Sequence, residues 1–61
     1  MDPTTEFIDT PALAEWLGLH PQLPVQWRYQ GDGPPFVKIG RSVRYRVNDV
    51  EAWLAENTVN P

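Results

Sequence analysis

The sequence predicts a small α+β domain built from three short helices and one two-stranded β-hairpin. Three observations support this prediction: apolar residues recur at helical spacing in three segments, two stretches alternate around a glycine-containing turn, and the chain has 61 residues. A chain this short forms one domain, residues 1–61, and buries only ~60% of the surface that its unfolded form exposes. Residues 1–8 are expected to form a loose lead-in, with Phe7 and Ile8 docked on the core.

The first helix is expected over residues 11–17. Thr10 is a suitable N-cap because its hydroxyl can accept a backbone hydrogen bond, and Pro11 fits the first helical position. Gly18 supplies the usual stop after the last turn. The apolar residues of this helix recur at i, i+3 and i+4: Leu13, Trp16 and Leu17.

The second helix is expected to begin between Gln22 and Pro24 and to end by Gln30, with Gly31 as its cap. Pro24 limits the start, because a proline deeper in a helix removes a backbone hydrogen bond and crowds the preceding turn. The turn cluster at residues 31–35 then excludes both helix and strand. The apolar positions of the second helix are Leu19, Leu23 and Trp27.

A hairpin is expected from residues 36–39 and 43–46, which both alternate. A two-residue turn at residues 40–41 would mix apolar and charged side chains on each face of the hairpin. A three-residue loop at residues 40–42 separates them, and since a one-residue slip exchanges the faces, the sequence favours this register. It predicts an apolar face of Val37, Ile39, Val43 and Tyr45 and a basic face of Lys38, Arg44 and Arg46.

The third helix is expected to start after Asn48, because Glu51 three residues later completes a capping box. Residues 57–61 are expected to form a polar tail that frays. The apolar positions of the third helix are Val50, Trp53 and Leu54. Each tryptophan of the chain falls on an apolar helical face, so we expect one shared core of Trp16, Trp27 and Trp53.

Charge is segregated along the chain. The whole chain has a net charge of −3, yet residues 27–46 hold all five basic residues against one acidic residue, Asp32. A basic segment between acidic flanks indicates a polyanionic partner for that segment. The sequence therefore favours a nucleic-acid-binding domain.

Other function classes lack the residues that they need. No nucleophile has a plausible general base, and so small a domain can hardly form a deep pocket, so an enzyme is not expected. The chain has no cysteine and a single histidine, His20, so no metal, cofactor or small-molecule substrate is expected. No apolar run approaches the ~20 residues of a membrane span and no signal peptide is visible, so the bacterial cytoplasm is the expected location.

A helix, a tight glycine turn, a second helix, a basic hairpin and a closing helix describe a winged helix-turn-helix. In this fold the second helix can enter the major groove, ~12 Å wide, while the hairpin follows the backbone or the minor groove. Gln26 is the expected base reader, because an exposed glutamine can bond to N6 and N7 of adenine. Arg28 and Arg41 are expected to project away from the apolar faces that the helices and the hairpin share, and to contact DNA. The full set of expected DNA contacts is Gln22, Val25, Gln26, Arg28, Tyr29, Lys38, Arg41, Ser42, Arg44 and Arg46.

Six motifs between Phe7 and Leu54 carry a family resemblance: LAEWLG at 13–18, WRY at 27–29, GP at 33–34, KIGR at 38–41, VRY at 43–45 and DVEAWL at 49–54. They resemble the MerR-like helix-turn-helix family of phage excisionases and AlpA-type prophage regulators, and most of all the excisionases of actinobacterial phages. The resemblance implies that the second helix and the wing bind DNA. It further implies cooperative occupation of neighbouring sites, DNA bending, and a role in directing an integrase toward excision without any chemistry. The chain departs from the family at residues 19–24, where many relatives have a valine followed by a capping serine or threonine.

Three functions remain open from the sequence. The first is an excisionase whose copies associate head to tail on double-stranded DNA, through a basic wing and acidic first and third helices. The second is a prophage transcriptional regulator of the AlpA or MerR-like type. The third, suggested by the overall negative charge, is an acidic protein-interaction module or DNA mimic. Charge placement favours DNA binding, because a mimic should spread carboxylates over one face whereas this chain gathers its arginines on a hairpin.

Overall fold

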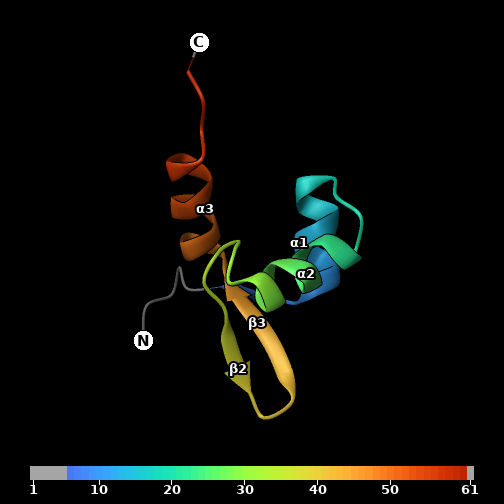
Figure 1. Ribbon diagram of the computed structural model, residues 1–61. Helices are drawn as coiled ribbons and strands as arrows, with labels where there is room; N and C mark the ends of the chain where they lie inside the picture. Colours follow the sequence, from blue (N-terminus) through green and yellow to red (C-terminus); the bar gives the residue numbers. More distant parts are fainter. Residues whose placement is uncertain (1–5, 61) are drawn as a thin grey trace.

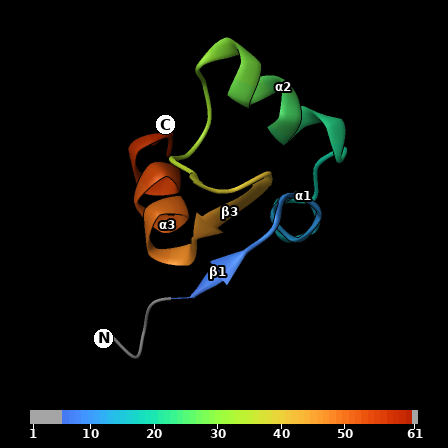
Figure 2. The same ribbon diagram turned by 90° about the horizontal axis from the view of Figure 1, so that it is seen from below.

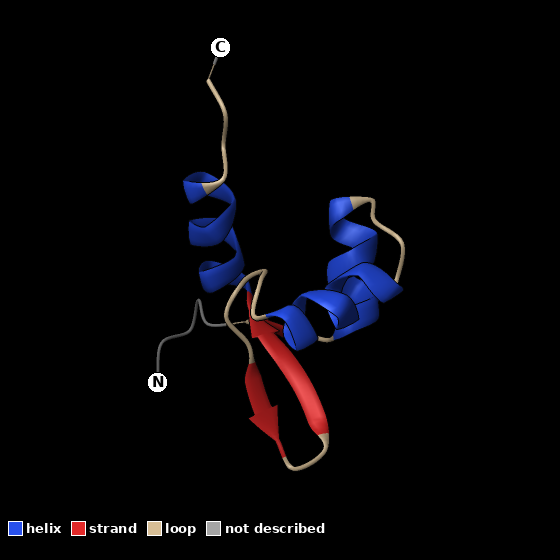
Figure 3. Cartoon of the chain, in the orientation of Figure 1, coloured by secondary structure: helices blue, strands red, loops and turns tan. Residues whose placement is uncertain are grey.

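The computed structural model describes residues 6–60, so the first five residues of the lead-in and Pro61 of the tail lie outside the described part. Figure 1 shows α1 and α2 on one side of the strands and α3 on the other, with the hairpin projecting away from the helices. The predicted winged helix-turn-helix, with three helices and a hairpin, is confirmed (Figure 3). The elements are β1 (Phe7–Ile8), α1 (Thr10–Leu17), α2 (Gln22–Gln30), β2 (Val37–Ile39), β3 (Ser42–Arg46) and α3 (Val47–Glu56).

The sheet has a third strand that the sequence did not predict. Strand β1 pairs antiparallel with β3 and lies beside it in Figure 2. The strand order is β1-β3-β2. Ile8 packs against the core as expected, whereas Phe7 remains 45% exposed. The backbone N–H of Val47 also donates to the carbonyl of Glu6 over 2.9 Å. The end of the expected lead-in is therefore a sheet edge, fixed to the centre of the domain by backbone hydrogen bonds.

The register predicted for the hairpin is wrong. The turn contains only Gly40 and Arg41, and Gly40 has φ +61°. A two-residue hairpin turn with positive φ at its first position matches the twist of the flanking strands, and glycine adopts that conformation without strain. The register therefore follows the preferred geometry of the turn, even though it does not separate apolar from charged side chains on the two faces of the hairpin. The observed pairs are Val37 with Arg44, Lys38 with Val43, and Ile39 with Ser42.

The new register redistributes the hairpin side chains. Directly opposite residues of paired strands share a face, so Lys38 lies on the face of Val43, while Ile39 lies on the opposite face and is 59% exposed. Phe36, which was not expected to point inward, packs against Tyr45 with ring centroids 6.2 Å apart. The expected basic face of Lys38, Arg44 and Arg46 therefore does not exist.

The core lies where α1, β3 and α3 meet. Leu13, Tyr45 and Val50 form its centre, each at most 1% exposed. Four partly buried residues pack against them: Ile8, Leu17, Val43 and Leu54. The core therefore draws on α1, α3 and two strands, and it joins the segment before the first helix to the last helix.

The tryptophans do not share one core, contrary to the prediction. Trp16 is 45% exposed. Trp27 and Trp53 are half-buried and pack on each other, with ring centroids 5.2 Å apart and planes inclined by 53°. This pair joins α2 to α3 beside the turn cluster, where Trp27 lies against Gly33.

Two of the predicted helix starts are displaced by one residue or more. Asp9, not Thr10, caps α1, because its Oδ1 accepts from the N–H of Ala12 over 3.0 Å. Helix α3 begins at Val47, so the residue expected to be its cap, Asn48, lies inside the helix. The remaining boundaries, the α2 range and the left-handed caps Gly18 and Gly31, agree with the prediction.

Replacement of the true cap should therefore cost stability where replacement of the expected one does not. We expect Asp9→Ala to lower the free energy of unfolding by about 1 kcal/mol, the usual value of a lost N-cap. Asn48→Ala should change it by less than about 0.5 kcal/mol, as for an ordinary surface substitution. Urea denaturation followed by circular dichroism measures both. A larger loss for Asn48→Ala than for Asp9→Ala would contradict the observed start of α3.

Candidate nucleic-acid interface

The segment between α1 and α2 forms a tight turn. Gly18 has φ +68°, and the N–H of Leu19 donates to the carbonyl of Ala14 over 2.9 Å. The N-cap residue of α2 is Pro21, which offers no side-chain hydrogen bond. Just before it, Nδ1 of His20 accepts from the N–H of Gln22, the first residue of α2, over 3.1 Å. Pro24, in the first turn of α2, is buried.

One face of α2 is open to a partner. Gln22, Gln26 and Tyr29 are exposed, and Tyr29 has an exposed fraction of 89%. Val25 is half-buried and so contributes less to this surface. The exposed side chains recur at intervals of three and four residues, which places them along one stripe of the helix. Gln26, the expected base reader, lies in the middle of this stripe.

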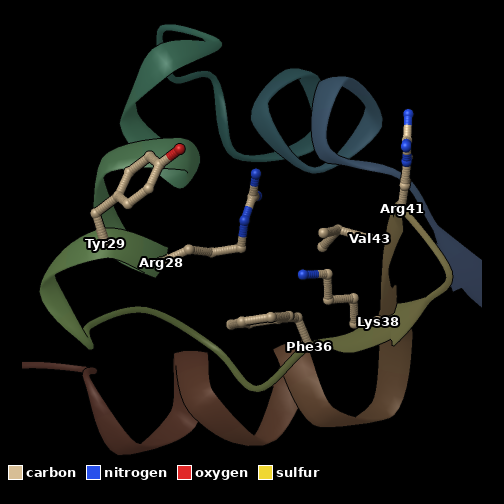
Figure 4. A pocket seen from close by; sticks show the side chains of 6 residues that line it. All are labelled: Arg28, Tyr29, Phe36, Lys38, Arg41 and Val43. Atoms are coloured by element: carbon tan, nitrogen blue, oxygen red, sulfur yellow. The ribbon is translucent and has the colours of Figure 1, made fainter.

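A cleft of about 340 Å³ lies between α2 and the hairpin. Figure 4 shows side chains that line it: Arg28 and Tyr29 from α2, Lys38 and Val43 from the hairpin strands, and Arg41 at the edge, from the hairpin turn. Four of the residues predicted to contact DNA are thus brought together, although they lie up to 13 positions apart in the chain. The sequence did not identify the two apolar residues of the lining, Phe36 and Val43, as part of a site.

Hydrogen bonds hold the side chain of Arg28 in place, whereas it was expected to project away from the apolar faces of the helices and the hairpin. Its Nη1 donates to Oγ1 of Thr10 over 3.1 Å and to the hydroxyl of Tyr45 over 3.0 Å. Its guanidinium carbon also lies 5.9 Å from the centroid of the Phe36 ring, within the range of a cation–π contact. The side chain is half-buried and runs across the middle of the cleft (Figure 4).

The other two cations of the cleft are exposed. Arg41 extends from the hairpin turn, and Lys38 points from β2 toward the cleft (Figure 4). Within residues 6–60, no carboxylate lies within 4.0 Å of either side chain or of Arg28, since the one ion pair in this range joins Arg46 to Asp49. The cleft thus holds three positive charges with no neighbouring counter-charge from the described chain.

Three of the predicted contact residues on the sheet lie outside the cleft. Arg46 pairs with Asp49 over 3.3 Å and lies 5.7 Å from the ring of Phe7. Arg44 donates from Nη1 to the carbonyl of Val43 over 2.9 Å. Ser42 is exposed at the start of β3. These side chains belong to the outer face of the sheet, which also carries Val37 and Ile39.

The comparison with protein families agrees with this geometry. The helix-turn-helix domain family matches residues 7–58, which covers all six elements. The chain belongs to the helix-turn-helix domain family. This family contains small DNA-binding proteins of the excisionase and AlpA-like kind. No curated protein and no solved structure matched the chain.

As a helix-turn-helix domain, the chain binds double-stranded DNA sequence-specifically. In such domains the second helix is the recognition helix and lies in the major groove. In this chain α2 occupies the position of that helix, and its exposed stripe ends beside the basic cleft. No helix in the described range 6–60 has the length and apolar character needed to cross a membrane.

Proposed function

We propose that this helix-turn-helix domain is an architectural DNA-binding protein of the phage excisionase type, without catalytic activity of its own. It would occupy tandem sites, bend the DNA and direct an integrase toward excision. The observation that carries the proposal is the basic cleft between α2 and the hairpin, on a chain whose net charge is −3. This arrangement gives a DNA-facing surface and leaves acidic surface elsewhere for contacts between proteins.

One copy alone has few charges for DNA. Of the five basic residues, Arg46 is already paired with Asp49. About three to four phosphate contacts remain, which corresponds to a salt slope near −3 and a modest affinity. A recognition helix of nine residues also reads few bases. Both deficits are offset if several copies bind neighbouring repeats and contact one another.

The structure offers two unlike surfaces for such contacts. The outer face of the sheet combines exposed apolar side chains with arginines, and its members are Phe7, Ile39, Arg44 and Arg46. Exposed carboxylates lie on the helices: Glu15 on α1, and Glu51 and Glu56 on α3. A contact between unlike surfaces is heterologous, so it repeats along the DNA instead of closing as a two-fold dimer. A curved row of copies would bend the duplex as it follows the groove.

Two alternatives use the same molecule differently. A prophage regulator of the AlpA or MerR-like type would bind DNA through the same cleft, and a gene position beside an integrase gene separates it from an excisionase. A DNA mimic would have to present carboxylates where this domain presents its cleft cations. The three cations without a carboxylate neighbour support DNA binding over mimicry.

Titration onto DNA that carries one site or several tandem sites tests the proposal. The protein should be a monomer in sedimentation without DNA, since each interface is small and screened by salt. Binding to tandem sites should be cooperative, and electrophoretic mobility should fall by more than the added mass explains. A stable dimer without DNA, or independent binding to each repeat, would contradict the proposal.

A matched pair of variants locates the contact between copies. Ile39→Ser removes an exposed apolar side chain from the outer face of the sheet, and it should abolish cooperativity while affinity for a single site is kept. Val59→Ser removes a similar side chain from the segment after α3, where the exposed fraction is 86%, and should leave cooperativity unchanged. Equal cooperativity in the two variants would show that copies meet elsewhere.

A further inference from the structure

We infer that the cleft between α2 and the hairpin clamps one backbone phosphate of duplex DNA, and that Thr10 and Tyr45 preset Arg28 for this contact. The inference rests on the DNA-binding function and names the group that the cleft takes. It also assigns a positioning role to two residues that lie outside the expected set of DNA contacts. Neither residue lines the cleft itself.

The argument begins with the hydrogen bonds of Arg28. A guanidinium has five N–H donors, and two of them belong to Nη1. The two acceptors of Nη1 are the hydroxyls of Thr10 and Tyr45, at 3.1 Å and 3.0 Å. The donors of Nε and Nη2 find no acceptor within residues 6–60. One nitrogen of the guanidinium is therefore anchored, and the remaining donors are available to an anion in the cleft.

The anchor is rigid because it comes from two other elements. Thr10 is the first residue of α1, and Tyr45 lies on β3 with an exposed fraction of only 1%. The Phe36 ring, 5.9 Å from the guanidinium carbon, borders the same side chain. An arginine that is ordered before binding loses less conformational freedom when it meets its partner. Arg28 is thus preset, unlike an arginine that extends into solvent.

The chemistry of the partner follows from the remaining charges. Lys38 and Arg41 enter the same cleft from the hairpin, and no carboxylate of the described chain balances them. An arginine fork binds phosphate through two parallel hydrogen bonds, and a lysine ammonium adds a compact positive charge. The cleft is open at the surface, so a phosphate can enter while it remains part of a duplex. One phosphate held between recognition helix and wing would also set the position of α2 in the major groove.

The inference is tested with DNA in which a single phosphate is replaced by an uncharged methylphosphonate. For the unaltered protein, a scan along both strands at the edge of the site should find one position whose replacement weakens binding by roughly tenfold or more, the value of a lost charge-assisted hydrogen bond. Tyr45→Phe and Thr10→Val each remove one anchoring hydroxyl and keep the shape of the side chain. Both variants should bind unaltered DNA more weakly than the unaltered protein does. At that one position, the logarithm of the fold loss in affinity caused by the methylphosphonate should be at most half of its value for the unaltered protein.

The salt dependence and a control complete the experiment. The variant that combines Thr10→Val with Tyr45→Phe should bind DNA with a weaker salt dependence. The slope of the logarithm of the binding constant against the logarithm of the salt concentration should fall in magnitude by up to ~0.9, the contribution of one phosphate. Thr58→Val, which removes a hydroxyl from the segment after α3, is the matched control and should leave the sensitivity at that position unchanged. Should Tyr45→Phe fail to fold, the Thr10→Val variant alone decides the matter.

Two results separate the clamp from the function on which it rests. If the protein binds DNA but neither variant changes the effect of any single methylphosphonate, the clamp is overturned and the DNA-binding function stands. The same holds if Tyr45→Phe lowers only the melting temperature and leaves the salt slope unchanged. If no duplex is bound at any salt concentration, the DNA-binding function fails and the clamp fails with it.

Discussion

Leu13→Ala is expected to leave most of the protein unfolded at room temperature. Leu13 is fully buried at the centre of the core, where it meets Tyr45 and Val50. Replacing a buried leucine by alanine costs about 2–5 kcal/mol, because apolar contacts are lost and a cavity remains. A domain of this size has only about 3–5 kcal/mol of stability in total. Circular dichroism at increasing temperature should show a missing or much lowered transition.

The matched control is a larger side chain that lies in solvent. Tyr29→Ala removes more atoms than Leu13→Ala, but Tyr29 is 89% exposed. We expect the free energy of unfolding to change by less than about 0.5 kcal/mol. A cooperative, nearly unaltered transition for Leu13→Ala, or unfolding of Tyr29→Ala, would show that the core has been placed wrongly.

Gly33→Ala is expected to have the second largest effect. Gly33 has φ +83°, a conformation that L-residues adopt only at a cost. In addition, an added Cβ would lie 2.8 Å from a ring carbon of Trp27 and 3.0 Å from its Cβ. The tryptophan cannot yield easily, because its ring also packs on Trp53. We expect a loss of about 1–2 kcal/mol from the backbone conformation and about 1–3 kcal/mol from overpacking.

Gly31→Ala separates these two contributions. Gly31 has φ +76°, close to that of Gly33, but nothing lies within 4 Å of an added Cβ. It should therefore lose only the backbone contribution, about 1–2 kcal/mol. Urea unfolding followed by tryptophan fluorescence measures both variants and reports on the stacked pair directly. Equal losses would mean that Trp27 moves aside without cost.

The helices were predictable because their signals are local. Glycines with positive φ end α1 and α2, and apolar spacing identified all three helices. Caps were less predictable, since Asp9 and Thr10 are adjacent residues that can both accept the same kind of hydrogen bond. The exposure of Trp16 could not be predicted either. The spacing of an apolar residue predicts the face of the helix on which it lies. It does not predict whether another element of the fold covers that part of the face.

The sheet was harder to predict because its decisive interactions are not local. Strand β1 has two residues, too few for an alternation to be recognised, and its partner residues on β3, Arg46 and Tyr45, lie 39 and 37 positions later in the chain. In the hairpin, the alternation of Val37 and Ile39 suggested an inward face. Phe36, one residue earlier, takes the inward place against Tyr45, and the turn at Gly40 fixes the register accordingly.

The predicted DNA contacts stay predictions, but the structure brings four of them together. Arg28, Tyr29, Lys38 and Arg41 were all expected to contact DNA, and they meet in one cleft. The expected grouping of Lys38 with the arginines of β3 failed together with the register. The anchoring of Arg28 by Thr10 and Tyr45 had no signal in the sequence, because hydroxyl groups 18 and 17 positions away can be matched to it only after folding.

The direct junction of β3 and α3 has a mechanical consequence. Strand β3 ends at Arg46 and α3 begins at Val47, so no loop residue separates them. Hinge motions are absorbed by loop or terminal residues that change their backbone angles, and here the pairing of Arg46 with Asp49 bridges the only such position. We therefore expect the hairpin and the last helix to move together as one rigid unit. A duplex that tilted the hairpin would then tilt α3 with it, and would turn the carboxylates of α3 toward or away from whatever lies next along the DNA.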